Sequence, residues 1–333
     1  MTQALSESLV TLGACTGRLD GTEHTKVVVY EPSGRGLDVE DWAARFRPEL
    51  MRSLRTQGAV LVRGAVDSPE LLHAVGARIG GELLSYTERS TPRTQVSSRV
   101  YTSTEYPRNQ TIAQHNESAY SDGYPHWLFF ACGKAAETGG ETPLADSRAV
   151  LDRLPAGLVT RFREKGVLYT RTFREGMGLT WQESFQTEDR QTVEAYCRAH
   201  GIECAWTGEG LRTRHRRPAL IADPVSGREI WFNQAHLFHT SNLPAATRAA
   251  LAELFDEEDM PRGARYGDGA AIPDGDMELV REAYDETMHV FPWAEGDLLM
   301  VNNLLVSHGR KPYTGDREIL VAMAGKGGDG DAG

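Results

Sequence analysis

Two residues with metal-binding side chains lie two positions apart in the segment QHNESAY (114–120). Alternate residues of an extended strand face the same side, so His115 and Glu117 can reach one metal ion while Asn116 points away. A distant histidine, His308, closes the apolar run VNNLLVSHG. Two imidazoles and one carboxylate on one face of an octahedron are the donor set of non-haem iron(II) oxygenases. The spacing therefore predicts an Fe(II) site whose open positions accept a bidentate 2-oxo acid and dioxygen.

Each of the two ligand segments is followed by a residue that could bind a carboxylate group of the 2-oxo acid. Thr142 comes after a Gly-Gly-Glu turn, and its hydroxyl can donate a hydrogen bond to a carboxylate near the metal. A turn with Pro, Gly and Asp follows His308, and Arg317 opens the returning strand. A hairpin of that length brings Arg317 beside His308, where a guanidinium can bind a carboxylate through two hydrogen bonds. These residues predict 2-oxoglutarate as co-substrate, with Arg310 as the rival for the arginine's role.

Two other classes of protein are compatible with parts of this pattern. A zinc enzyme or other redox-silent metallohydrolase would use the same three ligands and a water molecule, but it would need neither Thr142 nor Arg317. A jelly-roll binding module without catalysis would tolerate loss of any one ligand, whereas all three positions are filled here. The complete set of residues favours the oxygenase.

Short strands must position these residues, because runs rich in aromatic and β-branched residues are separated by Gly, Pro, Asn and Asp. A buried strand is predicted over 124–133, and the chain is β-like again from residue 286 onward. Helical spacing of apolar residues predicts helices over 39–56 and 68–81. The fold class is therefore mainly β with flanking helices, with a jelly-roll core.

A single domain is the simplest organisation for the 333 residues, since no repeat and no Gly/Ser or Pro linker divides them. We expect the oxygenase domain to span residues 21–325. The N-terminal residues 1–20 are expected to be poorly ordered, and the low-complexity end, 326–333, is expected to form a flexible tail.

The composition excludes several kinds of partner. A net charge of −11 repels nucleic acid and anionic membranes. No apolar run is long enough for a membrane span, and no secretory signal is evident, so a cytoplasmic location is expected. The four cysteines form no metal-binding or paired motif and are predicted to be free thiols. The one basic cluster, RTRHRR (212–217), is either a solvated edge or a docking site for an acidic carrier domain.

Several segments together resemble a known family, and the likeness covers roughly residues 55–325. They are VYTSTEYPRNQTIAQHNES, GGETPLADSR, WFNQAHLFH and NNLLVSHGRKPYTGDREILVAMA. They are similar to the taurine dioxygenase superfamily of iron(II)/2-oxoglutarate oxygenases, and more narrowly to its syringomycin-biosynthesis aspartyl hydroxylase group. The resemblance implies a double-stranded β-helix core, iron ligands at His115, Glu117 and His308, and co-substrate contacts at Thr142 and Arg317. Many relatives carry Asp at the carboxylate position.

The resemblance also implies a reaction. In this family, oxidation of 2-oxoglutarate to succinate and carbon dioxide drives hydroxylation of an unactivated C–H bond. Related halogenases lack the carboxylate ligand, so Glu117 favours hydroxylation or desaturation over halogenation. The implied substrate is an amino acid or a derivative of one, free or tethered to a peptidyl carrier protein, in nonribosomal peptide (antibiotic) biosynthesis. Oxidation of a free amino acid or a sulfonate is the alternative.

Three residues in the segments that carry the resemblance have hydrogen-bonding groups suited to a substrate pocket: Asn109, Trp231 and Asn233. For Trp231, an ordinary place in the core is an equal alternative. A homo-oligomer is compatible with the sequence.

Overall fold

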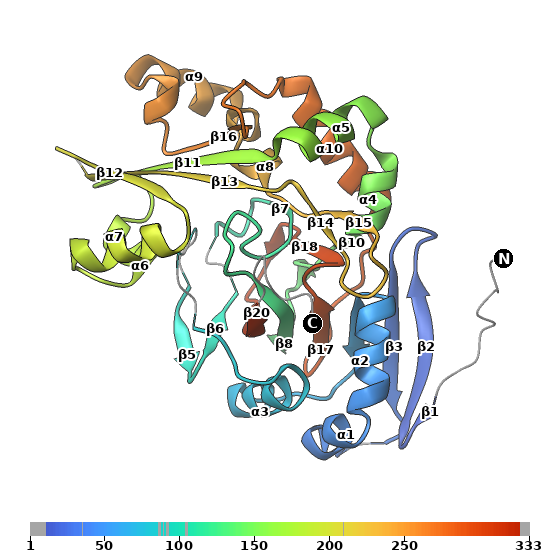
Figure 1. Cartoon of the computed structure of the whole chain (residues 1–333). Coiled ribbons are helices and arrows are strands. Elements are labelled where there is room, and N and C mark those ends of the chain that lie inside the picture. Colours follow the sequence, from blue (N-terminus) through green and yellow to red (C-terminus); the bar gives the residue numbers. More distant parts are fainter. Residues whose placement is uncertain are drawn as a thin grey trace.

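The computed structural model describes residues 11–34, 36–85, 88, 90, 93–103, 106–208 and 210–326. Figure 1 shows helices α1 to α3 at one end of the molecule and the long strands β11 to β13 at the opposite end. Strands β7 and β18, which carry the two predicted histidine ligands, lie between these ends.

The largest sheet joins strands from both ends of the described chain, in the order β1-β2-β3-β4-β17-β8-β20-β6-β5. Strands β3 and β4 pair in parallel, whereas β17 and β20 each pair antiparallel with β8. The bounds are β1 (Thr11–Leu12), β2 (Cys15–Gly21), β3 (Lys26–Pro32), β4 (Ala59–Val62), β5 (Gln95–Ser97), β6 (Val100–Thr102), β8 (Pro125–Lys134), β17 (Leu298–Asn302) and β20 (Glu318–Lys326).

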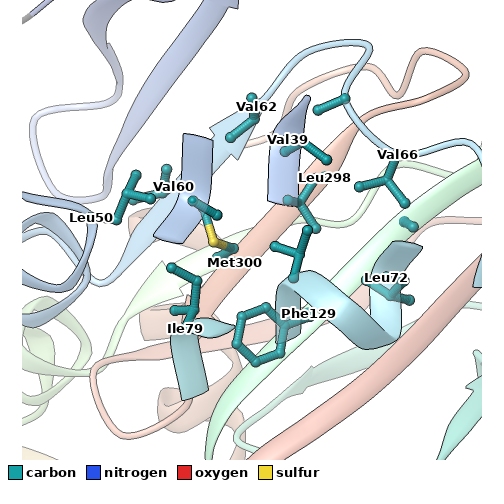
Figure 2. Packing of buried hydrophobic residues seen from close by; sticks show 14 of the residues in the cluster. Val39, Leu50, Val60, Val62, Val66, Leu72, Ile79, Phe129, Leu298 and Met300 are labelled. Atoms are coloured by element: carbon teal, nitrogen blue, oxygen red, sulfur yellow. The ribbon is translucent and has the colours of Figure 1, made fainter. Parts of the chain in front are cut away.

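Each face of this sheet buries its own apolar cluster, because side chains alternate along the strands. On β17, Leu298 and Met300 belong to the cluster covered by helices, whereas Leu299 and Val301 belong to the cluster on the other face. Figure 2 shows Phe129 of β8 within the helix-covered cluster. The covering helices are α1 (Val39–Arg45), α2 (Arg47–Thr56) and α3 (Pro69–Gly80).

A three-stranded sheet packs on the second face and carries the predicted metal-binding strands. Its order is β10 (Leu144–Asp146), β18 (Val306–Arg310) and β7 (Ile112–His115). Leu144 and Val306 share a buried cluster with Leu299 of the large sheet, so the two sheets have a common core. The expected mixture of a β core with flanking helices is confirmed; a closed double-stranded β-helix stays an expectation from the family.

The remaining strands form one four-stranded sheet and two short pairs, and further helices accompany them. A four-stranded sheet has the order β12-β13-β11-β16, and two pairs, β14 with β15 and β19 with β9, complete the strands of the described residues. These strands are β9 (Thr138–Gly139), β11 (Val167–Arg174), β12 (Glu203–Thr207), β13 (Gly210–Arg217), β14 (Leu220–Ala222), β15 (Glu229–Trp231), β16 (Arg262–Tyr266) and β19 (Tyr313–Thr314). The helices are α4 (Ser147–Arg153), α5 (Ala156–Lys165), α6 (Trp181–Phe185), α7 (Arg190–Ala199), α8 (Ala235–Phe238), α9 (Ala245–Leu254) and α10 (Asp274–Thr287), with short 3₁₀ turns at Thr240–Asn242 and Glu257–Asp259.

Two local expectations are corrected by the structure. The predicted loose order of residues 1–20 is wrong from residue 11 onward, because β1 and β2 form the edge of the large sheet and bury Leu12 and Cys15. Exposed Gly13 and Ala14 separate these two buried residues, so no alternating apolar pattern marks the strands in the sequence. The helix expected over 39–56 is two helices that meet at Phe46, since Pro48 has no N–H to continue the first helix's hydrogen bonds. Residues 1–10 and 327–333, at the two ends of the chain, lie outside the described residues.

Candidate metal centre

The strand pairing places the two predicted histidine ligands directly opposite each other. His115 ends β7 and His308 lies in the middle of β18, and the two are partners in the antiparallel register. Their ring centroids are 4.4 Å apart. The pairing shifts just beyond His308, where a Cβ on Gly309 would lie 2.7 Å from the Ile112 carbonyl oxygen. Glycine at this position therefore lets the strands approach closely beside the histidines.

Glu117 completes the set from the loop that follows β7. One ligand atom from each of His115, Glu117 and His308 lies within 4.8 Å of the others, and no other group of this kind is found in the described part of the chain. The Glu117 Oε2 atom is 3.9 Å from Nε2 of His308. The carboxylate also accepts a 2.7 Å hydrogen bond from Arg93, and both side chains are buried. The structure thus brings all three predicted ligands together.

The two imidazoles are in a state that suits metal binding. Burial lowers the pKa of His115 and lowers the pKa of His308 well below its usual value, and the charges of His115 and Arg93 lower that of His308 further. Neutral rings keep the lone pair that a metal requires. The Nδ1 atom of His115 is 2.9 Å from the Ala113 carbonyl oxygen, which makes Nδ1 the donor and leaves Nε2 for the metal. This donor chemistry fits a divalent iron ion.

A buried polar network holds the loop that carries Glu117. The Asn303 side chain accepts from Glu117 N at 2.6 Å and donates to the Glu117 and Pro125 carbonyl oxygens at 3.0 and 2.8 Å. Asn116 points away from the metal ligands, as the sequence predicts, and donates to the Asn303 carbonyl and to Ser147 Oγ. Because these groups satisfy one another, the loop has one well-defined path.

A cavity opens beside the three ligands. Its lining combines charged, polar and apolar side chains, among them Arg93, Ile112, His115, Phe130, Thr142, His308, Arg310, Arg317 and Ile319. The cavity therefore contains both residues predicted to bind 2-oxoglutarate, and also the rival arginine.

The three residues that bear on the co-substrate have different contacts. The Thr142 hydroxyl accepts a 3.0 Å hydrogen bond from Trp293 Nε1. Arg317 donates from Nε to the Gly140 carbonyl oxygen at 2.8 Å, and burial lowers its pKa to about 10. Arg310 instead uses both terminal nitrogens on backbone carbonyl oxygens of the 106–110 loop, at 2.7 to 2.9 Å. The contacts leave Arg317 better suited than Arg310 to receive a carboxylate.

The three predicted substrate-binding residues are not among those that line this cavity. Asn109 is exposed. Trp231 is fully buried in a different cluster and packs edge-on against Phe162, with ring centroids 5.0 Å apart. Asn233 is also fully buried, and its amide bonds the backbone of Ala219 and Ala235. Trp231 and Asn233 are therefore corrected to structural residues; alternation along β15 turns Ile230, rather than Trp231, toward the shared core of the two sheets.

The predicted basic cluster is largely neutralised. On β13, Arg212 pairs with Asp259, and Arg214 and Arg216 pair with Glu203. The four cysteines are free, as predicted. None of the helices in the described ranges is long and apolar enough to cross a membrane.

Comparison with known proteins gives the family. The model for "Taurine catabolism dioxygenase TauD, TfdA family" matches residues 22–323. The chain belongs to this family. The predicted enzyme class, a dioxygenase dependent on iron(II) and 2-oxoglutarate, is confirmed by this membership together with the convergent His-Glu-His set.

Individual TauD/TfdA relatives extend the comparison. The dapdiamide synthesis protein DdaC of Enterobacter agglomerans is 40% identical over 307 residues, which cover 92% of each chain. A clavaminate synthase-like protein of Arabidopsis thaliana is 31% identical and covers 81% of this chain and 82% of its own. The structure of PvcB from Pseudomonas aeruginosa has a TM-score of 0.56 at 14% identity, over 94% of this chain and 92% of that chain, a likeness of fold.

Two residues at this TauD/TfdA site escape the sequence analysis. Arg93 lies 22 positions before the first ligand and belongs to no motif, so no local pattern reveals its contact with Glu117. Asn303, in contrast, belongs to an Asn-Asn pair inside the apolar run before His308. Two amides in a buried run signal a polar network, because buried amides need partners.

Proposed function

We propose that the chain hydroxylates an unactivated C–H bond of an amino acid or an amino-acid-derived molecule in natural-product biosynthesis. In this proposal, His115, Glu117 and His308 hold the iron, and Thr142 and Arg317 bind 2-oxoglutarate. The observation that carries it is the convergence of three ligand atoms within 4.8 Å, two of them on histidines that line a cavity together with both co-substrate residues.

The bound iron and 2-oxoglutarate supply the oxidising chemistry when present, and the chain supplies position and exclusion of water. Its two histidines offer neutral nitrogens, and the part-buried Arg317 offers a cation. A cation partly removed from water favours an anionic partner, and a dicarboxylate provides one at its far end. The apolar side chains of Ile112, Phe130 and Ile319 support a largely dry reaction space.

The biosynthetic role is supported by the relative named for dapdiamide synthesis, at 40% identity over 92% of both chains. The narrower likeness to syringomycin-type aspartyl hydroxylases stays a prediction. Attachment of the substrate to a peptidyl carrier protein also stays a prediction, and the pairing of Arg212, Arg214 and Arg216 with acidic side chains weakens the basic cluster as its docking site.

The metal assignment is tested by His308→Ala and His115→Ala. Each variant should lose Fe(II) binding in an anaerobic titration, because two remaining ligands hold a divalent ion poorly, and the weak visible band of the iron–2-oxoglutarate chelate should disappear. His73→Ala, outside the site, is the control. Wild-type binding in either ligand variant would remove the proposed centre.

The substrate assignment is tested with a panel of free amino acids, the same amino acids loaded on carrier protein, and sulfonates. Turnover is followed as succinate formed and as a mass gain of one oxygen in the product. We expect coupled hydroxylation of an amino-acid-type substrate; coupled turnover of sulfonates alone would assign the chain to the alternative reaction.

A further inference from the structure

The buried ion pair between Arg93 and Glu117 is a feature of the centre that the ligand set does not require. The Arg93 Nη2 atom is 2.7 Å from Glu117 Oε2, and the side chains are 4% and 5% exposed. The same oxygen lies 3.9 Å from His308 Nε2. Taking two charges out of water is costly, and such a pair is weak evidence for stability alone. Its place against a metal-ligand carboxylate points to a role at the metal.

Two described residues shortly before this arginine are held by contacts with other elements. The Glu88 carboxylate accepts hydrogen bonds from Ser121 Oγ at 2.8 Å and from Tyr196 Oη at 3.0 Å. The Arg262 side chain donates to the Ser90 carbonyl oxygen. Residue 88 is thus bound to α7 and, through Ser121, to the loop that also carries Glu117, and residue 90 is bound to β16.

We propose that Arg93 is a positioning residue for the metal centre: its guanidinium holds the Glu117 carboxylate in the one orientation that faces both histidines. This inference rests on the proposed function of the triad. The terminal torsion of a glutamate is broad, so an unrestrained carboxylate rotates freely. A carboxylate has about four lone-pair sites, so a bond to Arg93 is compatible with a bond from the same group to a metal ion. A carboxylate held in this way is limited to a single metal bond, which keeps the neighbouring coordination positions vacant for co-substrate and dioxygen.

A rival interpretation predicts the opposite change in metal affinity when Arg93 is replaced. If Arg93 only replaces the missing positive charge in the metal-free protein, it competes with the metal, and its removal tightens metal binding. If it positions Glu117, its removal weakens metal binding. Measuring affinity separates the two.

The experiment is an anaerobic titration of the full chain with Co(II) alone, followed by visible absorption, which reports both affinity and coordination geometry. Arg93→Met and Arg93→Gln should bind Co(II) about 10- to 100-fold more weakly, the range for loss of a partner that orients a ligand. Their absorption bands should also shift, because the carboxylate becomes free to bind through both oxygens. Arg174→Met is the matched control, since Arg174 pairs with Asp259 and does not line the cavity.

Circular dichroism identifies which variants fold, and the glutamine variant carries the test if the methionine variant does not fold. Co(II) affinity equal to or tighter than wild type in a folded Arg93 variant overturns the proposal. His308→Ala is titrated beside them. If that variant binds Co(II) like wild type, the proposed centre itself is wrong; if it loses the metal while the Arg93 variants keep it, only the role of Arg93 is wrong.

Discussion

At the scale of single residues, the site is a balance of buried charges. One carboxylate, that of Glu117, faces two neutral imidazoles and the Arg93 guanidinium, and Arg317 lies in the same cavity. The Arg93 charge is paired with Glu117, so an anion such as a dicarboxylate is favoured at Arg317, while the neutral imidazoles suit a divalent metal ion.

The choice between the two cavity arginines is testable. Arg317→Met should weaken 2-oxoglutarate binding by at least about 30-fold, corresponding to about 2 kcal/mol for truncating one partner of a buried charge pair. Fe(II) affinity should stay near wild type. Both are measured by titration, with 2-oxoglutarate added to the anaerobic Fe(II) protein.

Arg310→Met is the comparison for that experiment. Because Arg310 bonds three backbone carbonyl oxygens of the 106–110 loop, its loss should lower stability more than 2-oxoglutarate affinity. The assignment of Arg317 is wrong if the two variants exchange these effects.

At the scale of elements, two antiparallel strands and one loop make the centre. The register of β7 on β18 fixes the histidines opposite each other, and the Asn303 side chain fixes the loop that begins at Asn116. A one-residue slip of either strand would turn its ligand to the other face. The site thus depends on pairing and on a buried amide as much as on the ligands themselves.

The role of that amide gives a prediction. Asn303→Ala leaves the Glu117 N–H and two buried carbonyl groups without this partner, so the free energy of unfolding should fall by about 3 kcal/mol or more, at about 1 to 3 kcal/mol for each unsatisfied buried group. Urea denaturation measures this loss, and metal titration should show weaker binding. Asn242→Ala, whose exposed amide donates only to Leu237, should change neither.

At the scale of the whole molecule, the two sheets share one apolar core, and a histidine buried on α8 makes the fold sensitive to acid. His236 is 1% exposed, its Nε2 is 2.8 Å from the Gln114 carbonyl oxygen, and burial lowers its pKa to about 4. As pH falls below about 6.5, the unfolded chain takes up a proton that the folded chain does not, so stability decreases.

This linkage predicts a specific loss of stability in acid. Between pH 7.5 and pH 5, His236 alone should lower the free energy of unfolding by about 2 kcal/mol. His236→Gln has no such group, so its stability should fall by about that much less than wild type over the same interval. Urea denaturation of both proteins at the two pH values is the measurement, and parallel losses would contradict the assigned pKa. It stays a prediction that residues 21–325 form one domain. A single transition in the same urea curves would support it.

The sequence by itself determined the features that depend on local spacing. The two-residue step from His115 to Glu117, the apolar run before His308 and the arginine after the next turn predict the enzyme class and the co-substrate, because these residue types match the donor set of iron(II) oxygenases. The strand expected to carry both of the first ligands ends at His115, and Glu117 lies in the loop that follows it. The narrower choice of substrate did not follow, and neither Trp231 nor Asn233 lies at the cavity.

Only the tertiary structure decided which distant residues meet. Nothing near Arg93 in the sequence predicts its bond to Glu117, and nothing local predicts that Arg310 binds the backbone carbonyl oxygens of the 106–110 loop. These contacts depend on sheet register and on how one segment crosses another, which are properties of packing between elements far apart along the chain. Local patterns indicate which side chains of a strand lie on the same face. Which distant residues those side chains contact is decided only when the whole core packs together.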